Sequence, residues 1–203
     1  MIVVHHLNQS RSLRILWLLE ELGLPYEVRR HERDPKTRLA PEALRAVHPL
    51  GKAPVIETEG RVIAESGAIV EWICARHGPH LLPAAGSAAH VEHLELMHFA
   101  EGSAMTPILL NLYVGRLGPA GAPLRPRIDA ELDNHFSFLE NRIRPSGHFV
   151  LDDLSAADVM LSFPVGVLAL LGQEPRYPRL AAFNARIRAR PAFARALTRA
   201  GGD

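Results

Sequence analysis

The chain has 203 residues, which is enough for one large domain or two small ones. Its hydrophobic content of 47% and charged content of 22% are typical of a globular protein. A net charge of +1 gives no indication of a nucleic-acid or acidic-membrane partner. No apolar run approaches about 18 residues, and Met1 leads directly into a strand-like segment. We therefore expect neither a membrane span nor a signal peptide.

The cysteine and histidine content limits the chemistry further. Cys74 is the single cysteine, so there is no internal disulfide framework and no C-x-x-C redox pair, and the cytoplasm is the expected compartment. Cys74 itself is expected to be a small buried apolar group. Among the histidines, His5 and His6 point to opposite faces of a predicted strand, whereas His90 and His93 lack a third ligand in sequence. We therefore expect no metal site.

The N-terminal segment has the pattern strand, helix, strand. Residues 2–7 are strand-like, and residues 13–22 are apolar at nearly every position until the helix ends at Gly23. A strand restarts at 25–28, which completes a βαβ unit with an expected parallel sheet and right-handed crossover. Residues 31–50 are polar and irregular and allow one short helix over 41–47.

Residues 51–69 contain a predicted hairpin followed by a helix. Two short β-branched strands flank a turn, and Glu65 and Ser66 then open a helix over 67–75. A cis bond between Ala53 and Pro54 would turn the preceding loop sharply and leave the next backbone groups free for an extended ligand. The helix start offers a hydroxyl and N–H groups to an anion. These residues alone fit a site for a small carboxylate-bearing peptide or a plain hairpin with a capped helix.

The remainder of the chain is predicted to be helical. Residues 81–87 have the composition of a linker. Apolar residues from 91 to 112 have a helical period, with Pro107 expected to kink one long helix, and a second helix spans 128–143. A third, over 156–171, is apolar almost all round and should lie at the centre of a bundle; two shorter helices follow. Ser155 and Asp158 form a predicted capping box for this third helix.

The order β-α-β-α-β-β-α followed by an all-α half resembles the cytosolic glutathione transferases. The resemblance is carried by NQSRSLRILWLLEELGLPYE at 8–27, HPLGKAPVI at 48–56, AESGAI at 64–69 and LSAADVMLSFP at 154–164. Together with EGSAMTP at 101–107, these stretches are similar to the serine-type fungal and bacterial branch with an SRS-type first loop. The resemblance implies an α/β thioredoxin-like domain over 1–80, a linker over 81–87 and an all-α domain over 88–203.

The resemblance also implies which residue activates the thiol of glutathione. Family members use Tyr, Ser or Cys near the start of the first helix, and here the first loop contains no Cys and no Tyr precedes it. Ser10 is the first candidate for the hydrogen-bond donor to the thiolate. Ser12 is the second candidate and is otherwise expected to cap the first helix.

The glutathione contacts implied by the resemblance cluster around the hairpin. Val55, after Pro54, should pair with the cysteinyl unit through its backbone. The other expected contacts are Glu65 with the γ-glutamyl ammonium, Ser66 with its carboxylate, Lys52 with the glycyl carboxylate, and Arg38 in support. Lys52 and Arg38 also fit ordinary solvated loop residues. Candidates for the pocket of the second substrate are Glu101, Met105 and Tyr113, of which Met105 also fits core or dimer packing.

The expected activity is that of a homodimeric glutathione transferase, with glutathione as co-substrate and no metal. The thiolate would add to a hydrophobic electrophile, and the same groups would serve to reduce organic hydroperoxides. Two alternatives remain at this stage. One is a glutathione-binding or scaffold protein of the same fold without significant turnover, and the other is a glutathione-dependent disulfide reductase.

Overall fold

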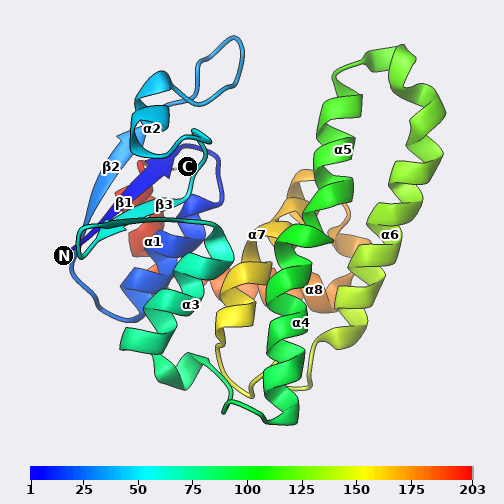
Figure 1. Ribbon diagram of the computed structural model, residues 1–203. Coiled ribbons are helices and arrows are strands. Elements are labelled where there is room, and N and C mark those ends of the chain that lie inside the picture. Colours follow the sequence, from blue (N-terminus) through cyan, green and yellow to red (C-terminus); the bar gives the residue numbers. More distant parts are fainter. Residues whose placement is uncertain (203) are drawn as a thin grey trace. The chain divides into compact units, whose positions relative to one another are not determined.

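The computed structural model describes residues 1–202 and divides into two compact units (Figure 1). The first unit contains Met1–His80 together with the chain from Ile187 onward, and the second contains Leu81–Arg186. The first unit is therefore built from both ends of the sequence.

The first unit is organised around a four-stranded sheet. The strands are β1 (Ile2–Leu7), β2 (Tyr26–His31), β3 (Val55–Thr58) and β4 (Arg61–Ala64), arranged in the order β2-β1-β3-β4. β1 pairs in parallel with β2, whereas β3 is antiparallel to both β1 and β4. The predicted thioredoxin-like arrangement is confirmed, including the βαβ unit and the hairpin.

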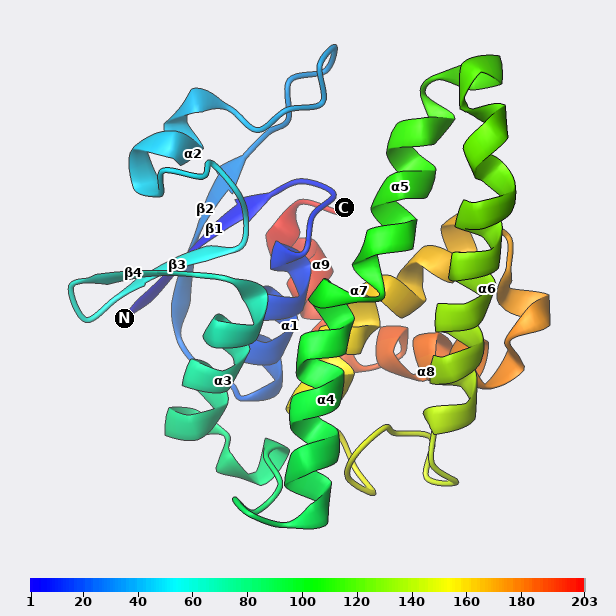
Figure 2. The ribbon, with the colours of Figure 1, turned by 45° about the vertical axis from the view of Figure 1, so that its right-hand side comes forward.

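Four α-helices belong to the first unit in whole or in large part. They are α1 (Ser12–Glu21), α2 (Glu42–Val47), α3 (Ser66–His77) and α9 (Pro191–Ala200), with a short 3₁₀ helix, η1 (Pro79–Leu81), after α3. Figure 2 shows α1 and α3 together on one face of the sheet. Ile15 to Leu19 of α1 are fully buried, because this helix packs against the sheet and against α3 and α9 of the same unit.

The placement of α9 is a feature that helical periodicity does not reveal. The sequence-based boundary assigned it to the helical domain, but α9 packs along α1 in the first unit. The indole of Trp17 meets the ring of Phe193 edge-on at 5.7 Å between centroids. Beside this contact, the Arg190 guanidinium donates two hydrogen bonds to the Glu21 carboxylate, at 2.5 and 3.0 Å. An apolar contact and a bidentate ion pair thus hold the end of the chain.

The second unit is all-helical. Its helices are α4 (Ala88–Gly102), α5 (Met105–Gly115), α6 (Arg125–Arg142), α7 (Ala156–Leu170) and the greater part of α8 (Pro178–Arg188), with 3₁₀ turns η2 (Gly118–Leu124) and η3 (Glu174–Arg176). α5 and α6 run side by side, and α7 packs against α4 and α5 (Figure 1). Most of α7 is buried, which confirms the central helix predicted from its apolar sequence. Over residues 1–202, no helix has both the length and the apolar character needed to cross a membrane.

The prediction of one long helix kinked at Pro107 is wrong. The segment forms two helices, and the break falls at Ser103 and Ala104. Pro107 is the third residue of α5, in a first turn whose amides have no partner within the helix. A proline is tolerated there because it removes no helical hydrogen bond.

The capping box of α7 is confirmed. The Asp158 N–H donates to Ser155 Oγ at 3.3 Å, and the Ser155 N–H donates to Asp158 Oδ2 at 2.7 Å. Asp158 Oδ1 also accepts a hydrogen bond from the Phe149 N–H at 3.0 Å. The Asp158 carboxylate therefore joins the start of the central helix to the preceding loop.

Candidate functional site

The register of the sheet brings the predicted glutathione contacts of the first unit to one edge. His5 of β1 lies opposite Val55, which in turn lies opposite Ala64 of β4. The end of β1, the start of β3 and the end of β4 are therefore neighbours. The loops that continue from them carry Ser10, Pro54 and Glu65.

Two serines and one histidine form a buried hydrogen-bonded line beside this edge. Ser10 Oγ lies 2.7 Å from Ser12 Oγ, which lies 2.9 Å from Nδ1 of His6. The Ser12 N–H donates to Ser10 Oγ at 3.2 Å, and the Leu7 N–H donates to Ser12 Oγ at 3.2 Å. Relative exposures are 9% for Ser10, 0% for Ser12 and 1% for His6, so the line meets solvent at Ser10.

The expectation that Ser12 caps α1 is wrong. Ser12 is the first residue of the helix, and the N-cap position is Arg11, whose side chain makes no capping hydrogen bond. The Ser12 hydroxyl instead faces the end of β1, where Leu7 and His6 contact it. Ser10 accepts the first amide of the helix, that of Ser12, through its hydroxyl.

The loop over residues 51–54 leads directly into β3. The peptide bond between Ala53 and Pro54 is cis, and Pro54 and Val55 are buried. Gly51 has φ +56°, a left-handed conformation that favours glycine. Lys52 follows it, is exposed, and has no ion-pair partner within residues 1–202. Its ammonium is open to an anion at this edge.

The start of α3 has a strained N-cap residue and no side-chain cap. Glu65 is the N-cap residue with φ 69°, a region that costs a non-glycine residue on the order of 1–3 kcal/mol. No side chain caps the helix at this position. Ser66, its first residue, is 4% exposed, and its hydroxyl makes no hydrogen bond within the described chain. A carboxylate is a suitable partner for this hydroxyl and the first-turn amides.

Arg38 and the loop that contains Ser10 are tied together. The Arg38 guanidinium donates to Gln9 Oε1, and the Arg33 side chain donates to the carbonyls of Asn8, at 3.1 Å, and Arg38, at 3.1 Å. The Asn8 amide oxygen accepts the Arg33 N–H at 2.9 Å. Arg38 is thereby brought to the loop of residues 8–11, but its guanidinium already donates a hydrogen bond to Gln9.

His5 belongs to a separate network on the other side of β1. Its Nε2 lies 2.7 Å from Glu57 Oε1 and its Nδ1 lies 3.0 Å from Nε2 of His31, while Arg29 donates to the same carboxylate at 3.0 Å. The hydrogen bond from His5 holds the pKa of Glu57 below its usual value. Burial lowers the pKa of His31, and the nearby His5 and His6 act in the same direction. Within residues 1–202, no group of three or more His, Cys, Asp or Glu side chains is arranged so that it could hold a metal ion.

The candidate residues for a second-substrate pocket lie on α4 and α5. Glu101 is half-buried near the end of α4, Met105 is 3% exposed at the start of α5, and Tyr113 is 55% exposed near its end. A cavity of about 410 Å³ between the end of α4, α5 and α6 is lined by other residues, including Thr106, Leu110 and His135. The assignment of these three residues to a pocket stays a prediction.

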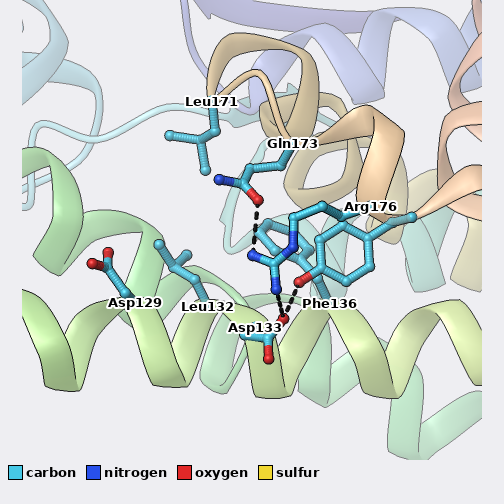
Figure 3. A pocket seen from close by; sticks show the side chains of 8 residues that line it. Asp129, Leu132, Asp133, Phe136, Leu171, Gln173 and Arg176 are labelled. Atoms are coloured by element: carbon cyan, nitrogen blue, oxygen red, sulfur yellow. Dashed lines mark hydrogen bonds and ion pairs between the residues drawn. The ribbon is translucent and has the colours of Figure 1, made fainter.

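A second cavity in the helical unit, of about 280 Å³, has a polar wall (Figure 3). Asp133 Oδ1 accepts hydrogen bonds from the Arg176 guanidinium at 2.5 Å and the Tyr177 hydroxyl at 2.6 Å. Burial and the bond to Asp133 raise the pKa of Tyr177 to about 12. The phenol therefore stays protonated near neutral pH, and its hydrogen is engaged by the carboxylate.

Sequence reasoning missed His6 and Arg33. Both gain their role through a partner outside their own segment: His6 reaches Ser12 at the start of α1, six positions away, and Arg33 reaches Asn8 across 25 positions. The pair His5-His6 in an apolar strand is the available signal for His6, because a buried polar side chain requires a hydrogen-bond partner. The partner itself has no sequence signature.

Comparisons with known proteins identify the family to which this fold belongs. The thioredoxin-like unit joined to an all-helical unit is the fold of the glutathione-dependent transferases. The family model for the glutathione S-transferase N-terminal domain matches residues 10–76, and the model for the C-terminal domain matches residues 103–191. The chain belongs to the glutathione S-transferase family and is a glutathione transferase.

Individual relatives extend the match over most of the chain. Glutathione S-transferase 3 of Schizosaccharomyces pombe is 34% identical over 181 residues, covering 81% of this chain and 73% of the relative. Glutathione S-transferase 1 of Saccharomyces cerevisiae is 30% identical, covering 81% and 79%. A crystal structure of a glutathione S-transferase from Actinobacillus pleuropneumoniae superposes with a TM-score of 0.89 at 31% identity, covering 100% of this chain and 94% of that one.

Proposed function

We propose that this glutathione transferase is of the serine type and that Ser10 donates a hydrogen bond to the thiolate of glutathione. The observation that supports this most directly is the position of the Ser10 hydroxyl. It is the solvent-side end of the line through Ser12 to His6, beside the edge of the sheet where the other predicted contacts gather.

The energetics of a serine donor are sufficient for thiol activation. A free thiol has a pKa of about 8.5, and a fall of roughly one to two units, or about 1.4–2.7 kcal/mol, makes it mostly thiolate near neutral pH. One hydrogen bond to a charged acceptor contributes about 1.5–3 kcal/mol. The interaction of the thiolate with the helix dipole at the start of α1 adds about 0.3–1 kcal/mol. Serine therefore acts as a donor and needs to be neither base nor nucleophile.

The proposed contacts with the rest of glutathione follow from the same edge. Val55 pairs with the cysteinyl unit through its backbone, after the cis bond at Pro54. Ser66 and the open first turn of α3 receive the γ-glutamyl carboxylate, and Glu65 faces its ammonium. Lys52 meets the glycyl carboxylate, with Arg38 in a supporting position. The two carboxylates of the tripeptide thus bind at two different segments, one at the start of α3 and the other at Lys52 in the loop before β3.

In the proposed reaction the thiolate attacks an electrophilic carbon of a hydrophobic small molecule held by the helical unit. A carbon–sulfur bond forms, the leaving group departs with its electron pair, and the thiol proton has already passed to solvent. We propose a second reaction in which the same thiolate attacks an oxygen of an organic hydroperoxide, the O–O bond breaks and the alcohol leaves. A second glutathione then converts the resulting sulfenic acid into glutathione disulfide and water. The family resemblance further supports a homodimer in the cytoplasm.

Retention on immobilised glutathione, followed by assays with an aryl halide, a hydroperoxide and a mixed disulfide, tests the proposal. We expect retention and turnover of the aryl halide. Loss of retention would refute every glutathione-dependent role. Retention without turnover of any substrate would favour a binding protein, and turnover of the mixed disulfide alone would favour a reductase.

The variants Ser10→Ala and Ser12→Ala separate the two candidate donors. Ser10→Ala should raise the pKa of the bound thiol by about one to two units, because one hydrogen bond to a charged group is lost. Turnover at neutral pH should fall by about 10- to 100-fold, with a small change in the KM for glutathione. A larger effect of Ser12→Ala, combined with an unchanged pH profile of Ser10→Ala, would contradict the assignment of Ser10.

A further inference from the structure

The buried line from Ser10 through Ser12 to His6 has a direction, which depends on where its protons lie. Each serine hydroxyl has one hydrogen to donate and two lone pairs to accept with. Nδ1 of His6 is either a donor or an acceptor, depending on whether it is protonated. The oxygen–oxygen distance of 2.7 Å between the serines is that of a well-formed hydrogen bond, so one serine donates to the other.

If Nδ1 of His6 carries a proton, the direction of the line is fixed. Ser12 Oγ then accepts from Nδ1–H of His6 and from the N–H of Leu7, which fills both lone pairs. The Ser12 hydroxyl hydrogen then has two acceptors within reach, Ser10 Oγ at 2.7 Å and the Leu7 carbonyl oxygen at 3.4 Å. The much shorter bond makes Ser12 the donor to Ser10. Ser10 Oγ accepts that bond and the N–H of Ser12, which fills its own lone pairs and leaves its hydrogen for an external acceptor.

If Nδ1 lacks a proton, the line runs the other way. The Ser12 hydroxyl then donates to Nδ1, and the Ser10 hydroxyl donates to Ser12. The hydrogen of Ser10 points into the protein, and a thiolate outside faces oxygen lone pairs. The two forms of one buried imidazole thus decide whether Ser10 is a donor or an acceptor toward its ligand.

We infer that His6 is a positioning residue for thiol activation and that it acts with its proton on Nδ1, so that the Ser10 hydroxyl faces the sulfur of glutathione. This inference rests on the proposed function. A negative acceptor beyond Ser10 favours this direction, because every donor in the line then points toward the charge. Ser12 relays the orientation, and neither His6 nor Ser12 needs to touch the tripeptide.

Two substitutions at the same position isolate the donor at Nδ1. His6→Asn can place an amide N–H close to the Nδ1 position, whereas His6→Leu retains apolar bulk and removes the donor. We expect His6→Leu to lower kcat by about tenfold, the effect of one lost hydrogen bond, with little change in the KM for glutathione. His6→Asn should restore most of the activity. The thiolate absorbance of bound glutathione, measured against pH, should shift to higher pH in His6→Leu only.

His5→Leu serves as the matched control, because it also removes a buried histidine from β1. The ring of His5 contacts Glu57 and His31 and has no place in the line to Ser10. This variant should leave the pH profile of the bound thiol unchanged. An equal shift in His5→Leu and His6→Leu would show that general damage to the strand is responsible and would overturn the inference.

Nitrogen NMR of the His6 ring in the intact, glutathione-saturated protein provides a test that does not depend on folding of the variants. We expect a proton on Nδ1, and a bare Nδ1 in this complex would overturn the inference. Failure of the unaltered protein to bind glutathione would refute the proposed function together with it. If Ser10→Ala shifts the thiol titration while His6→Leu and His6→Asn leave it unchanged, the inference about His6 alone is wrong.

Discussion

Replacing Asp158 with alanine should destabilise the helical unit far more than replacing Ser155, its partner in the capping box. The fully buried Asp158 carboxylate accepts bonds from the Ser155 N–H, at 2.7 Å, the Ser155 hydroxyl, at 2.6 Å, and the Phe149 N–H, at 3.0 Å. Alanine leaves two backbone N–H groups without an acceptor, at about 1–3 kcal/mol each. We expect a loss of about 4 kcal/mol for Asp158→Ala and about 1–2 kcal/mol for Ser155→Ala.

Urea unfolding followed by far-ultraviolet circular dichroism measures this difference. Tryptophan fluorescence is a poor probe here, because Trp17 and Trp72 both lie in the first unit. Asp158→Asn is the matched variant: its amide oxygen can accept one bond but its NH₂ group opposes the remaining donors, so we expect an intermediate loss. If Asp158→Ala lowered the free energy of unfolding no more than Ser155→Ala, the hydrogen bond from the Phe149 N–H would not contribute to stability, and the reasoning would be refuted.

Three further predictions concern the first unit. Burial alone would raise the pKa of Glu20, but bonds from Arg195 and Tyr26 hold it below its usual value. Arg195→Ala should therefore destabilise the protein at neutral pH by up to about 1 kcal/mol. Its difference from wild type in urea unfolding should shrink as pH falls through the folded-state pKa of Glu20, because the unfolded chain takes up the proton first, and only the bond from Arg195 to the Glu20 carbonyl should remain. Gly51→Ala should destabilise the protein by about 1–2 kcal/mol and raise the KM for glutathione, because the added Cβ would lie 2.7 Å from Arg45 Cγ. Gly60→Ala is the control: Gly60 also has a positive φ but has open space around it, so this substitution should destabilise the protein less. Burial and the charge of Glu71 raise the pKa of Cys74 to about 12, so alkylation should follow the rate of unfolding in urea, and rapid labelling of the native protein would contradict this.

The elements predicted correctly are those whose signals are local. The strands and hairpin of the first unit follow from β-branched runs and turn residues, and α7 follows from its apolar sequence and its capping box. Local composition is sufficient in these cases because each element carries its own start, end and apolar face.

The elements predicted incorrectly depend on contacts with distant residues. Periodicity shows that α9 has an apolar face, but it contains no information on which surface covers that face, and Phe193 in fact packs against Trp17. Ser12 occupies a position where a cap would be expected, yet its hydroxyl is taken by the strand before it. A side chain with two available hydrogen-bond partners bonds to the one that lies closer in the folded structure, and sequence spacing alone does not reveal which one that is.

The return of α9 to the first unit has a consequence for the synthesis of the protein on the ribosome. The sheet and α1 are made early, but Trp17 and Glu21 meet Phe193 and Arg190 only after almost the whole chain has been translated. Until then α1 lacks its cover, so the first unit cannot complete its core as the nascent chain emerges. A gene fragment that ends near residue 80 should accordingly yield a protein prone to aggregation, and supplying α9 as a separate peptide should improve its solubility.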